Sequence, residues 1–412
     1  MRIALISGSR SDRNALVMVR DKLFESGHSV TWMELGPAAM VGHRVLALPK
    51  EPWLPITAVE KALVWVSLQG IGEDGNRFAD LVILHGDRHE VLGAAVACNV
   101  MGIPIAHIGG GDITEGSQDD SFRHAITKLS HLHFASNQDS ADRIVQMGEE
   151  PDRVHVTGCP GIDMVMATPT LNKADTFAAV GLCAPSATES QSYWMTKEWR
   201  EMGERPAPQR SLLVLFHPNT LGDAASDLEA LSVALARRTE ALVLLGPNAD
   251  AGGDLIRREW QRLAQNRPDT VYHDNVEPQV FYSLLKWCDV LIGNSSAGFY
   301  EAPCFGIPVV NIGDRQEGRS RPCNMLFHPN LGPEDIAGAI DYTIRATPAP
   351  IELREPVTNT YGDGHAAERI AKVIGGISDH KSLLRKKFFG YIDLVHHTEV
   401  EALASFNKKV TK

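Results

Sequence analysis

Short, continuous runs of apolar residues alternate with longer segments in which apolar residues recur every three or four positions. In the first half of the chain the segments at 14–26 and 90–101 have this helical periodicity. The apolar runs around them lie at 3–6, 29–32, 81–84 and 103–108. Fully apolar strands that alternate with helices are typical of parallel sheets covered on both faces. The pattern therefore predicts a doubly wound, Rossmann-like α/β domain over residues 1–183.

The pattern stops near residue 184 and resumes at residue 211. Residues 184–210 combine three prolines with many polar side chains, so we interpret them as a linker or inserted surface element, with a short helix at 193–200. Residues 211–378 are predicted to form a second Rossmann-like domain. Residues 379–412 form a basic, amphipathic tail, predicted as a helix that docks on its own domain rather than on a membrane surface. The apolar runs of the second domain lie at 212–216, 241–245, 290–292 and 308–312.

Composition and charge exclude several classes of function. The 412 residues include 51 acidic and 40 basic side chains, a net charge of −11, which argues against a general binder of nucleic acid or anionic membranes. No run of about 18 apolar residues predicts a membrane span, and the apolar N-terminal run is too short for a signal peptide. The six cysteines are scattered and never spaced as C-x-x-C, so we expect reduced thiols, no structural zinc and a cytoplasmic protein.

Polar residues follow the apolar run at 81–84. In open α/β sheets, ligands bind at this carboxyl edge of the strands. Asp87 is a candidate general acid or base, and Arg88 is a candidate cation for a phosphate or carboxylate. The competing interpretation is a helix start, with Asp87 as the cap and Glu90 three residues later.

Three consecutive glycines, 109–111, follow the next run and lead into a cluster of carboxylates. Because glycine is entropically costly, we expect this backbone to be flexible or close to a ligand. The carboxylates could bind a divalent metal, although no ordered ligand spacing supports this, or could cap a helix near Phe122. They could also perform acid/base chemistry on a sugar or a similar polar substrate. Farther on, His131 and His133 alternate as on a strand, which favours structural roles. The carboxylates of the cluster are Asp112, Glu115, Asp119 and Asp120.

The second domain carries a more specific motif at residues 290–302. A strand ends at Gly293, a turn of small and hydroxyl-bearing residues follows, and a helix is predicted from Phe299. A turn of this kind before a helix N-terminus can bind an anion through backbone N–H groups and the helix dipole. Glu301 could accept hydrogen bonds from a ribose diol. The arginines at 315, 319 and 321 could add positive charge, and a plain capped helix is the alternative.

Taken together, these motifs resemble those of the hydrolysing UDP-N-acetylglucosamine 2-epimerases, including the enzymes of sialic-acid-type sugar pathways. The resemblance covers roughly residues 1–375, apart from the 184–210 insertion. The chain departs from the family pattern at several positions, and the most serious departure is Gly109, which stands where members commonly carry Glu or His. The matching motifs, in the same order, are residues 8–12, 86–88, 107–112, 119–133, 158–160, 217–218, 248–250, 293–298 with Glu301, 311–316 and 361–364.

The resemblance implies a GT-B-like fold, two Rossmann-like domains with the active site in the cleft between them. It implies that the second domain holds UDP, with the serine turn at the diphosphate and Glu301 at the ribose. It also implies a UDP-sugar as the small-molecule partner and a homo-oligomer, either a dimer or a tetramer. The implied substrate-binding residues are Arg10, His217, Asn248, Ser295, Ser296, Gly298, Glu301 and Arg315.

The family's chemistry expels UDP from C1 of the sugar while a base removes the C2 proton, which leaves a glycal. Water then adds at C1 and a proton adds at C2, giving N-acetylmannosamine, with no metal or other cofactor in this scheme. Alternatives are an epimerase that retains UDP, an epimerase of a diacetamido nucleotide sugar, a GT-B glycosyltransferase and a sensor that only binds. The implied catalytic residues are Asp87, Arg88, Asp112, Glu115, Asp119 and His124.

Overall fold

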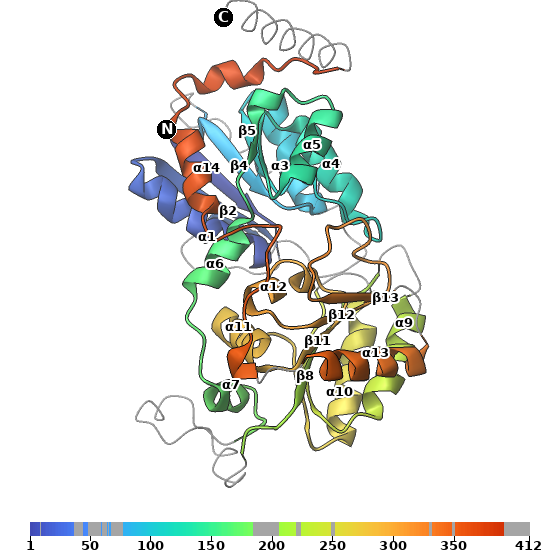
Figure 1. Cartoon of the computed structure of the whole chain (residues 1–412). Coiled ribbons are helices and arrows are strands. Elements are labelled where there is room, and N and C mark those ends of the chain that lie inside the picture. Colours follow the sequence, from blue (N-terminus) through green and yellow to red (C-terminus); the bar gives the residue numbers. More distant parts are fainter. Residues whose placement is uncertain are drawn as a thin grey trace, which may run out of the picture.

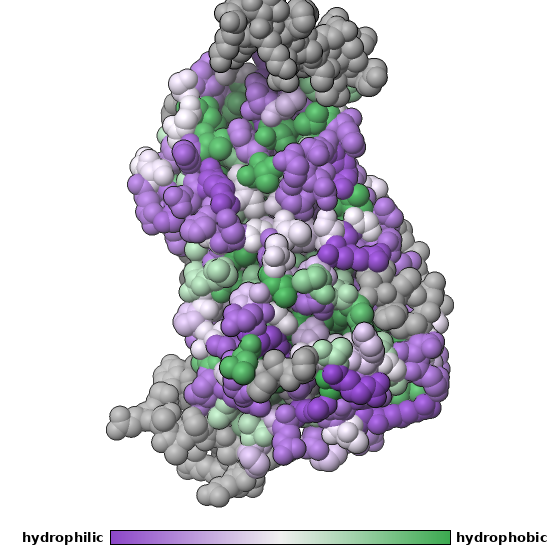
Figure 2. Space-filling view, viewed as in Figure 1, coloured by the Kyte–Doolittle hydropathy of each residue, from purple (hydrophilic) through white to green (hydrophobic). Residues whose placement is uncertain are grey.

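The computed structural model shows two α/β lobes stacked end to end (Figure 1). On the visible face hydrophilic side chains cover most of both lobes, with smaller apolar patches between them (Figure 2). Within the described part of the chain no helix has both the length and the apolar character needed to cross a membrane. The predicted helix at 193–200 lies outside the described residues. These are residues 1–8, 10–36, 44–47, 59, 64, 66, 77–183, 206–219, 224–248, 252–328, 332–347 and 351–390.

The first lobe contains a parallel sheet in the order β3-β2-β1-β4-β5-β6-β7. Helices α1 (Arg10–Glu25), α3 (His89–Val100), α4 (Asp119–Leu129) and α5 (Gln138–Gln146) accompany it. Apolar side chains cover both faces of the sheet, as the continuous apolar runs predicted. The strands are β1 (Arg2–Ser7), β2 (Ser29–Gly36), β3 (Arg44–Ala47), β4 (Leu81–His85), β5 (Ile105–Ile108), β6 (Leu132–Ala135) and β7 (Val154–Val156).

The second lobe repeats this arrangement in a parallel sheet of order β10-β9-β8-β11-β12-β13. Its strands are β8 (Ser211–Leu215), β9 (Ala241–Leu245), β10 (Thr270–His273), β11 (Val290–Gly293), β12 (Val309–Ile312) and β13 (Met325–His328). Its helices are α9 (Ala224–Ala236), α10 (Gly253–Asn266), α11 (Pro278–Trp287), α12 (Ala302–Phe305) and α13 (Pro333–Ala346). In both sheets the strand order reverses beside the first strand, which is where open α/β sheets bind ligands. The two doubly wound, Rossmann-like sheets confirm the predicted fold class.

The chain passes between the lobes twice. After α6 (Pro160–Ala167), helix α7 (Lys173–Ala179) contributes Phe177 to the core of the second lobe. Near the C-terminus, α14 (Ala366–Gly375) returns to the core of the first lobe. The Asp163 carboxylate on α6 accepts hydrogen bonds from the backbone N–H groups of Ala366 and Ala367, at 3.0 and 2.7 Å, and so caps α14.

As far as residue 390, the tail packs on the first lobe rather than on the second, which it follows in the sequence. Lys386 Nζ donates to the backbone carbonyls of Lys128 and Ser130 and pairs with Glu149 at 3.0 Å. The helix prediction is wrong here, because only residues 380–384 form a 3-10 turn. Tail backbone groups bond to the first lobe instead, as when Phe389 N–H donates to the Gly148 carbonyl at 3.0 Å.

Candidate functional site

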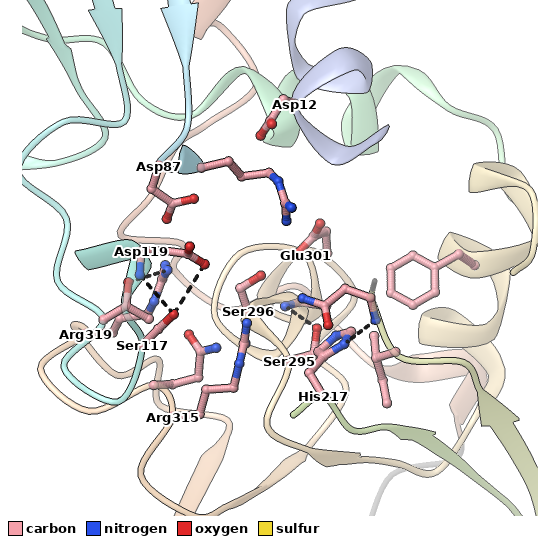
Figure 3. Close-up of a pocket in the computed structure, with 17 residues that line it drawn as sticks. Asp12, Asp87, Ser117, Asp119, His217, Ser295, Ser296, Glu301, Arg315 and Arg319 are labelled. Atoms are coloured by element: carbon pink, nitrogen blue, oxygen red, sulfur yellow. Dashed lines mark hydrogen bonds between the residues drawn. The ribbon is translucent and has the colours of Figure 1, made fainter. Parts of the chain in front are cut away.

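A cavity of about 330 Å³ lies between the two lobes. It is lined by loops that follow the carboxyl ends of strands in both sheets, as the topology predicts. In Figure 3, Asp87, Ser117, Asp119 and Arg319 form one side, and His217, Ser295 and Glu301 form another. The lining residues are Asp12, Asp87, Arg88, Thr114, Ser117, Asp119, Leu215, His217, Asn248, Phe281, Ser295, Ser296, Ala297, Glu301, Arg315, Gln316 and Arg319.

Asp87 follows β4 and is held by an arginine from α4. The buried Arg123 guanidinium donates to the Asp87 carboxylate through Nη2 and to the Asp112 carbonyl through Nη1, at 3.0 Å. Burial alone would raise the pKa of Asp87, but Arg123, Arg319 and Arg88 outweigh it and hold that pKa below its usual value. The competing interpretation of Asp87 as a helix cap is wrong, because Arg88 occupies the N-cap position of α3.

Asp119 opens α4 and presents its carboxylate to the cavity (Figure 3). The Ser117 hydroxyl donates to this carboxylate at 3.3 Å. The neighbouring Asp120 carboxylate accepts the backbone N–H of Thr114 at 2.6 Å and pairs with Arg123 at 3.1 Å. The helix begins earlier than the predicted start near Phe122, so both aspartates lie in its first turn and neither is the cap.

Three residues expected at the catalytic centre lie outside the cavity lining. The Asp112 carboxylate is buried and accepts hydrogen bonds from the hydroxyls of Ser136 and Ser140, at 2.5 and 2.6 Å, and from the Tyr300 hydroxyl of the second lobe. Glu115 is exposed, and His124 pairs with Asp120 at 3.4 Å. The structure thus brings Asp87, Arg88 and Asp119 to the cavity. Asp112 instead forms a hydrogen bond that links the two lobes.

None of the three glycines lines the cavity, and Gly110 and Gly111 pack against other parts of the protein. Gly109 and Gly111 have φ angles of +79° and +76°. A Cβ atom at Gly111 would lie 2.2 Å from the Ser140 carbonyl oxygen of α5, whereas a Cβ at Gly109 would meet open space. Close approach to a helix, not to a ligand, therefore explains the third glycine. His131 and His133 are structural as predicted, since His131 Nδ1 accepts the Ile105 N–H at 3.2 Å and His133 Nε2 bonds Glu149 at 3.1 Å.

The serine turn, residues 294–298, follows β11 and lines the second-lobe side of the cavity through Ser295 and Ser296. The Ser295 hydroxyl accepts the Ala297 N–H at 3.2 Å and caps a 3-10 turn at Ser296–Gly298. The helix predicted from Phe299 begins only at Ala302 and is four residues long. Both serines line the cavity and Gly298 does not. Because α12 is so short, its dipole is weak, and an anion at this turn would depend mainly on hydroxyl and turn N–H groups.

His217 and Arg315 border the same turn. The Asn248 backbone N–H donates to His217 Nδ1 at 3.0 Å, so the neutral imidazole carries its proton on Nε2. Burial and the nearby Arg315 lower the pKa of His217 to about 3, which keeps the ring uncharged near neutral pH. Arg315 donates to the Asn294 carbonyl at 3.3 Å and supplies a permanent positive charge.

Glu301 lines the cavity, and the pKa of its carboxyl group is unusual. Burial raises the pKa of its carboxyl to about 7. Its Oε2 atom is buried and has no hydrogen-bond partner among the described residues. A buried acceptor of this kind suits a pair of ligand hydroxyls, as the sequence predicted for a ribose diol.

The sequence did not predict every lining residue. Asp12, Thr114, Ser117, Phe281 and Gln316 were missed, although Asp12 follows β1 closely and could have been found by the same strand-end rule. Arg319 was expected only as additional charge. Arg10 lies in the first turn of α1, and its side chain is outside the described part of the structure.

Comparison with known proteins identifies the family. Residues 75–375, more than half of the chain, match the model of the family "UDP-N-acetylglucosamine 2-epimerase". The chain is 35% identical over 251 residues to the GDP/UDP-N,N′-diacetylbacillosamine 2-epimerase (hydrolyzing) of Campylobacter jejuni. That match covers 60% of this chain and 59% of the relative. It is 32% identical over 313 residues to the UDP-N,N′-diacetylbacillosamine 2-epimerase (hydrolyzing) of Legionella pneumophila, covering 74% of each protein.

A solved structure supports the fold. The UDP-GlcNAc 2-epimerase of Neisseria meningitidis, bound to UDP-GlcNAc, superposes with a TM-score of 0.68 at 17% identity, covering 91% of this chain and 99% of that one. This confirms the GT-B-like pairing of two Rossmann-like domains that the resemblance implied. By sequence and by fold, the chain belongs to the UDP-N-acetylglucosamine 2-epimerase family.

Proposed function

We propose that this protein is a hydrolysing UDP-N-acetylglucosamine 2-epimerase, which converts UDP-N-acetylglucosamine and water into N-acetylmannosamine and UDP. One observation carries the proposal: a single cavity joins two carboxylates of the first lobe, Asp87 and Asp119, to the serine turn, Arg315 and Glu301 of the second lobe. The names of the two relatives, both hydrolysing 2-epimerases of nucleotide-linked N,N′-diacetylbacillosamine, support the same reaction type.

The two sides of the cavity match the two demands of the reaction. In the first step a carboxylate takes the C2 proton, the C2–H electron pair forms the C1=C2 bond, and the C1–O bond breaks to release UDP. Asp87 suits the base because its arginine neighbours keep it ionised. Ser295, Ser296 and Arg315 would stabilise the charge that develops on the departing diphosphate.

In the second step water adds to C1 and a proton adds to the opposite face of C2. Asp119, across the cavity from the serine turn, would supply or relay that proton (Figure 3). The neutral His217 can donate from Nε2 to a phosphate oxygen, and Glu301 would accept hydrogen bonds from the ribose hydroxyls. Arg10 and Asn248 are further proposed contacts of the nucleotide.

Product analysis tests the proposal. The purified protein is incubated with UDP-N-acetylglucosamine, and in a parallel sample with UDP-N,N′-diacetylbacillosamine, and both sugars and nucleotides are separated by chromatography. We expect N-acetylmannosamine and UDP in equal amounts from the first substrate. UDP-N-acetylmannosamine would overturn the hydrolytic step, and conversion of the diacetamido substrate alone would overturn the assigned sugar.

We also propose a cytoplasmic homo-oligomer. The six cysteines all lie in described segments and none of them forms a disulfide there, which fits a reducing compartment. The oligomer rests on the family resemblance, in which dimers and tetramers recur. Light scattering coupled to size-exclusion chromatography would give a dimer or tetramer mass, and a monomer mass would contradict this part of the proposal.

A further inference from the structure

Arg319 places a guanidinium group from the second lobe at the end of the cavity that holds Asp87 and Asp119. In the proposed function this is the end that binds the sugar. Its loop follows β12, yet Nη2 donates to the Thr114 hydroxyl of the first lobe at 3.3 Å. The guanidinium carbon lies 5.0 Å from the centre of the Tyr300 ring. In Figure 3 the side chain lies beside Ser117 and Asp119, away from His217.

Two donors of this guanidinium are unused. Nε and Nη1 are buried and have no hydrogen-bond partner among the described residues. Leaving buried donors unpaired is unfavourable, and these two belong to a side chain that lines the cavity. They therefore indicate a ligand oxygen that accepts hydrogen bonds at this point.

The surrounding charges favour a neutral oxygen over a phosphate. The Asp87 and Asp112 carboxylates already interact electrostatically with the Arg319 guanidinium. A further anion here would be repelled by these carboxylates and by Asp119. The diphosphate has its own cation at the other side of the cavity, where Arg315 borders the serine turn.

Among neutral oxygens, a carbonyl fits better than a hydroxyl. A sugar hydroxyl can donate to the carboxylates of Asp87 or Asp119, but a carbonyl oxygen can only accept. The neighbouring hydroxyls are engaged, since that of Ser117 donates to Asp119 at 3.3 Å and that of Thr114 accepts from Arg319. Arg319 is thus the donor matched to an amide carbonyl at the sugar end.

We infer that Arg319 binds the carbonyl oxygen of the substrate's 2-acetamido group and so positions C2 for proton removal. The inference rests on the proposed function, because an acetamido sugar must occupy this end of the cavity. The acetamido group is attached to the carbon that loses its proton, so fixing the carbonyl turns the C2–H bond toward the carboxylates. The second lobe thereby contributes substrate selection to the acid/base side of the site.

Binding of non-cleavable analogues tests this assignment without requiring turnover. The methylene phosphonate analogues of UDP-N-acetylglucosamine and UDP-glucose, and UDP itself, are titrated calorimetrically into the wild type, Arg319→Gln and Arg319→Lys. The wild type should bind the acetamido analogue about tenfold more tightly than the glucose analogue, as for a hydrogen bond to a charged donor. Both variants should bring this ratio close to one, with UDP affinity changed by less than about twofold.

Arg321→Gln is the matched control, because this arginine lies on the same loop, is half exposed and pairs with Glu317 at 2.8 Å. It should keep the wild-type ratio.

An equal loss of affinity for UDP and both analogues in the Arg319 variants would show a phosphate contact and overturn the assignment. An acetamido preference that survives in a folded Arg319 variant, or that is absent from the wild type, would overturn it as well. If Arg319→Gln fails to fold, the ratio of the two analogue affinities in Arg319→Lys, which keeps the positive charge, tests the assignment. A wild type that selects the acetamido analogue but does not convert UDP-N-acetylglucosamine would refute the proposed function alone.

Discussion

The arginines around Asp87 keep its carboxylate ionised. The largest contribution comes from Arg123 of α4, whose guanidinium donates a hydrogen bond to it. The same helix begins with Asp119, so one short segment both tunes one carboxylate and presents the other. This division fits the proposal that the two aspartates serve different steps of one reaction.

Replacing Asp87 with asparagine removes the proposed base but keeps the shape of the side chain. We expect turnover to fall by roughly 10²–10⁴-fold, as is common for a lost general base. UDP affinity should change by less than about twofold, because Asp87 is not among the proposed nucleotide contacts and most of these lie in the other lobe. Steady-state kinetics and UDP titration check this, with Asp254→Asn, whose side chain is 82% exposed, as the control. Wild-type turnover in Asp87→Asn would contradict the role.

The raised pKa of Glu301 predicts a pH dependence of nucleotide binding. The carboxyl is protonated below a pKa of about 7, and only the ionised form accepts hydrogen bonds from both ribose hydroxyls. Affinity for UDP-glucose, whose diphosphate diester does not titrate in this range, should therefore weaken up to about tenfold per pH unit below pH 7. His217, with a pKa of about 3, contributes no titration there. Glu301→Gln should bind more weakly and without this slope; an unchanged slope would contradict the ribose contact.

The strand-end rule found the cavity residues that follow strands directly, such as Asp87, His217 and Ser295. It did not separate Asp119 from Asp112 and Glu115, because all three lie between the end of β5 and the first residue of α4, and sequence spacing does not show which carboxylates turn inward. Asp112 turns toward two serines of the first lobe and a tyrosine 188 residues away along the chain. No local pattern encodes that contact.

At the scale of the elements, the glycine run shows how a backbone is fixed for a close contact. Both Gly109→Ala and Gly111→Ala force a positive φ on alanine, which costs about 1 kcal/mol. Only the new Cβ at residue 111 also collides with the Ser140 carbonyl, so that variant should lose at least about 3 kcal/mol of unfolding free energy. Urea denaturation measures the unfolding free energy of both variants. Equal losses would contradict this account of the glycines at 109–111.

Elements with strong hydrophobic patterns were predicted well. The apolar runs correspond to β1, β4 and β5 in the first sheet and to β8, β9, β11 and β12 in the second. Predictions were weaker where a competing contact overrides local preference. The serine turn adopts a 3-10 conformation before a short α12, and the tail exchanges helical hydrogen bonds for contacts with Gly148, Arg153 and Glu149. These tertiary contacts are invisible to periodicity alone.

At the scale of the whole molecule, two loops from different lobes make backbone contact. One connects β5 to α4 in the first lobe (residues 109–118), and the other connects β12 to β13 in the second (residues 313–324). The Glu115 N–H donates to the Glu317 carbonyl at 3.1 Å. A Cβ atom at Gly116 would lie 2.6 Å from Arg315 Cα and 2.7 Å from the Asp314 carbonyl oxygen. Because Asp119 directly follows the first loop and Arg315 lies on the second, we expect this contact to couple the proposed acid/base side of the cavity to the proposed diphosphate side.

Gly116→Ala should separate the two loops and so weaken both sides of the site. We expect UDP affinity and turnover each to fall about tenfold, because a shift near 1 Å misplaces groups on both loops. Calorimetry and steady-state kinetics measure the two effects. Gly338→Ala is the control, since its Cβ meets open space in α13 and alanine favours the helix. An active Gly116→Ala variant with wild-type UDP affinity would contradict the coupling.

The most direct test of elimination of UDP with hydrolysis is proton NMR of the protein and UDP-N-acetylglucosamine in deuterated water. The account predicts free N-acetylmannosamine and UDP, with deuterium at C2 because the proton added there comes from solvent. Free N-acetylmannosamine that keeps its C2 proton, or a deuterated UDP-N-acetylmannosamine with no free sugar, would contradict it.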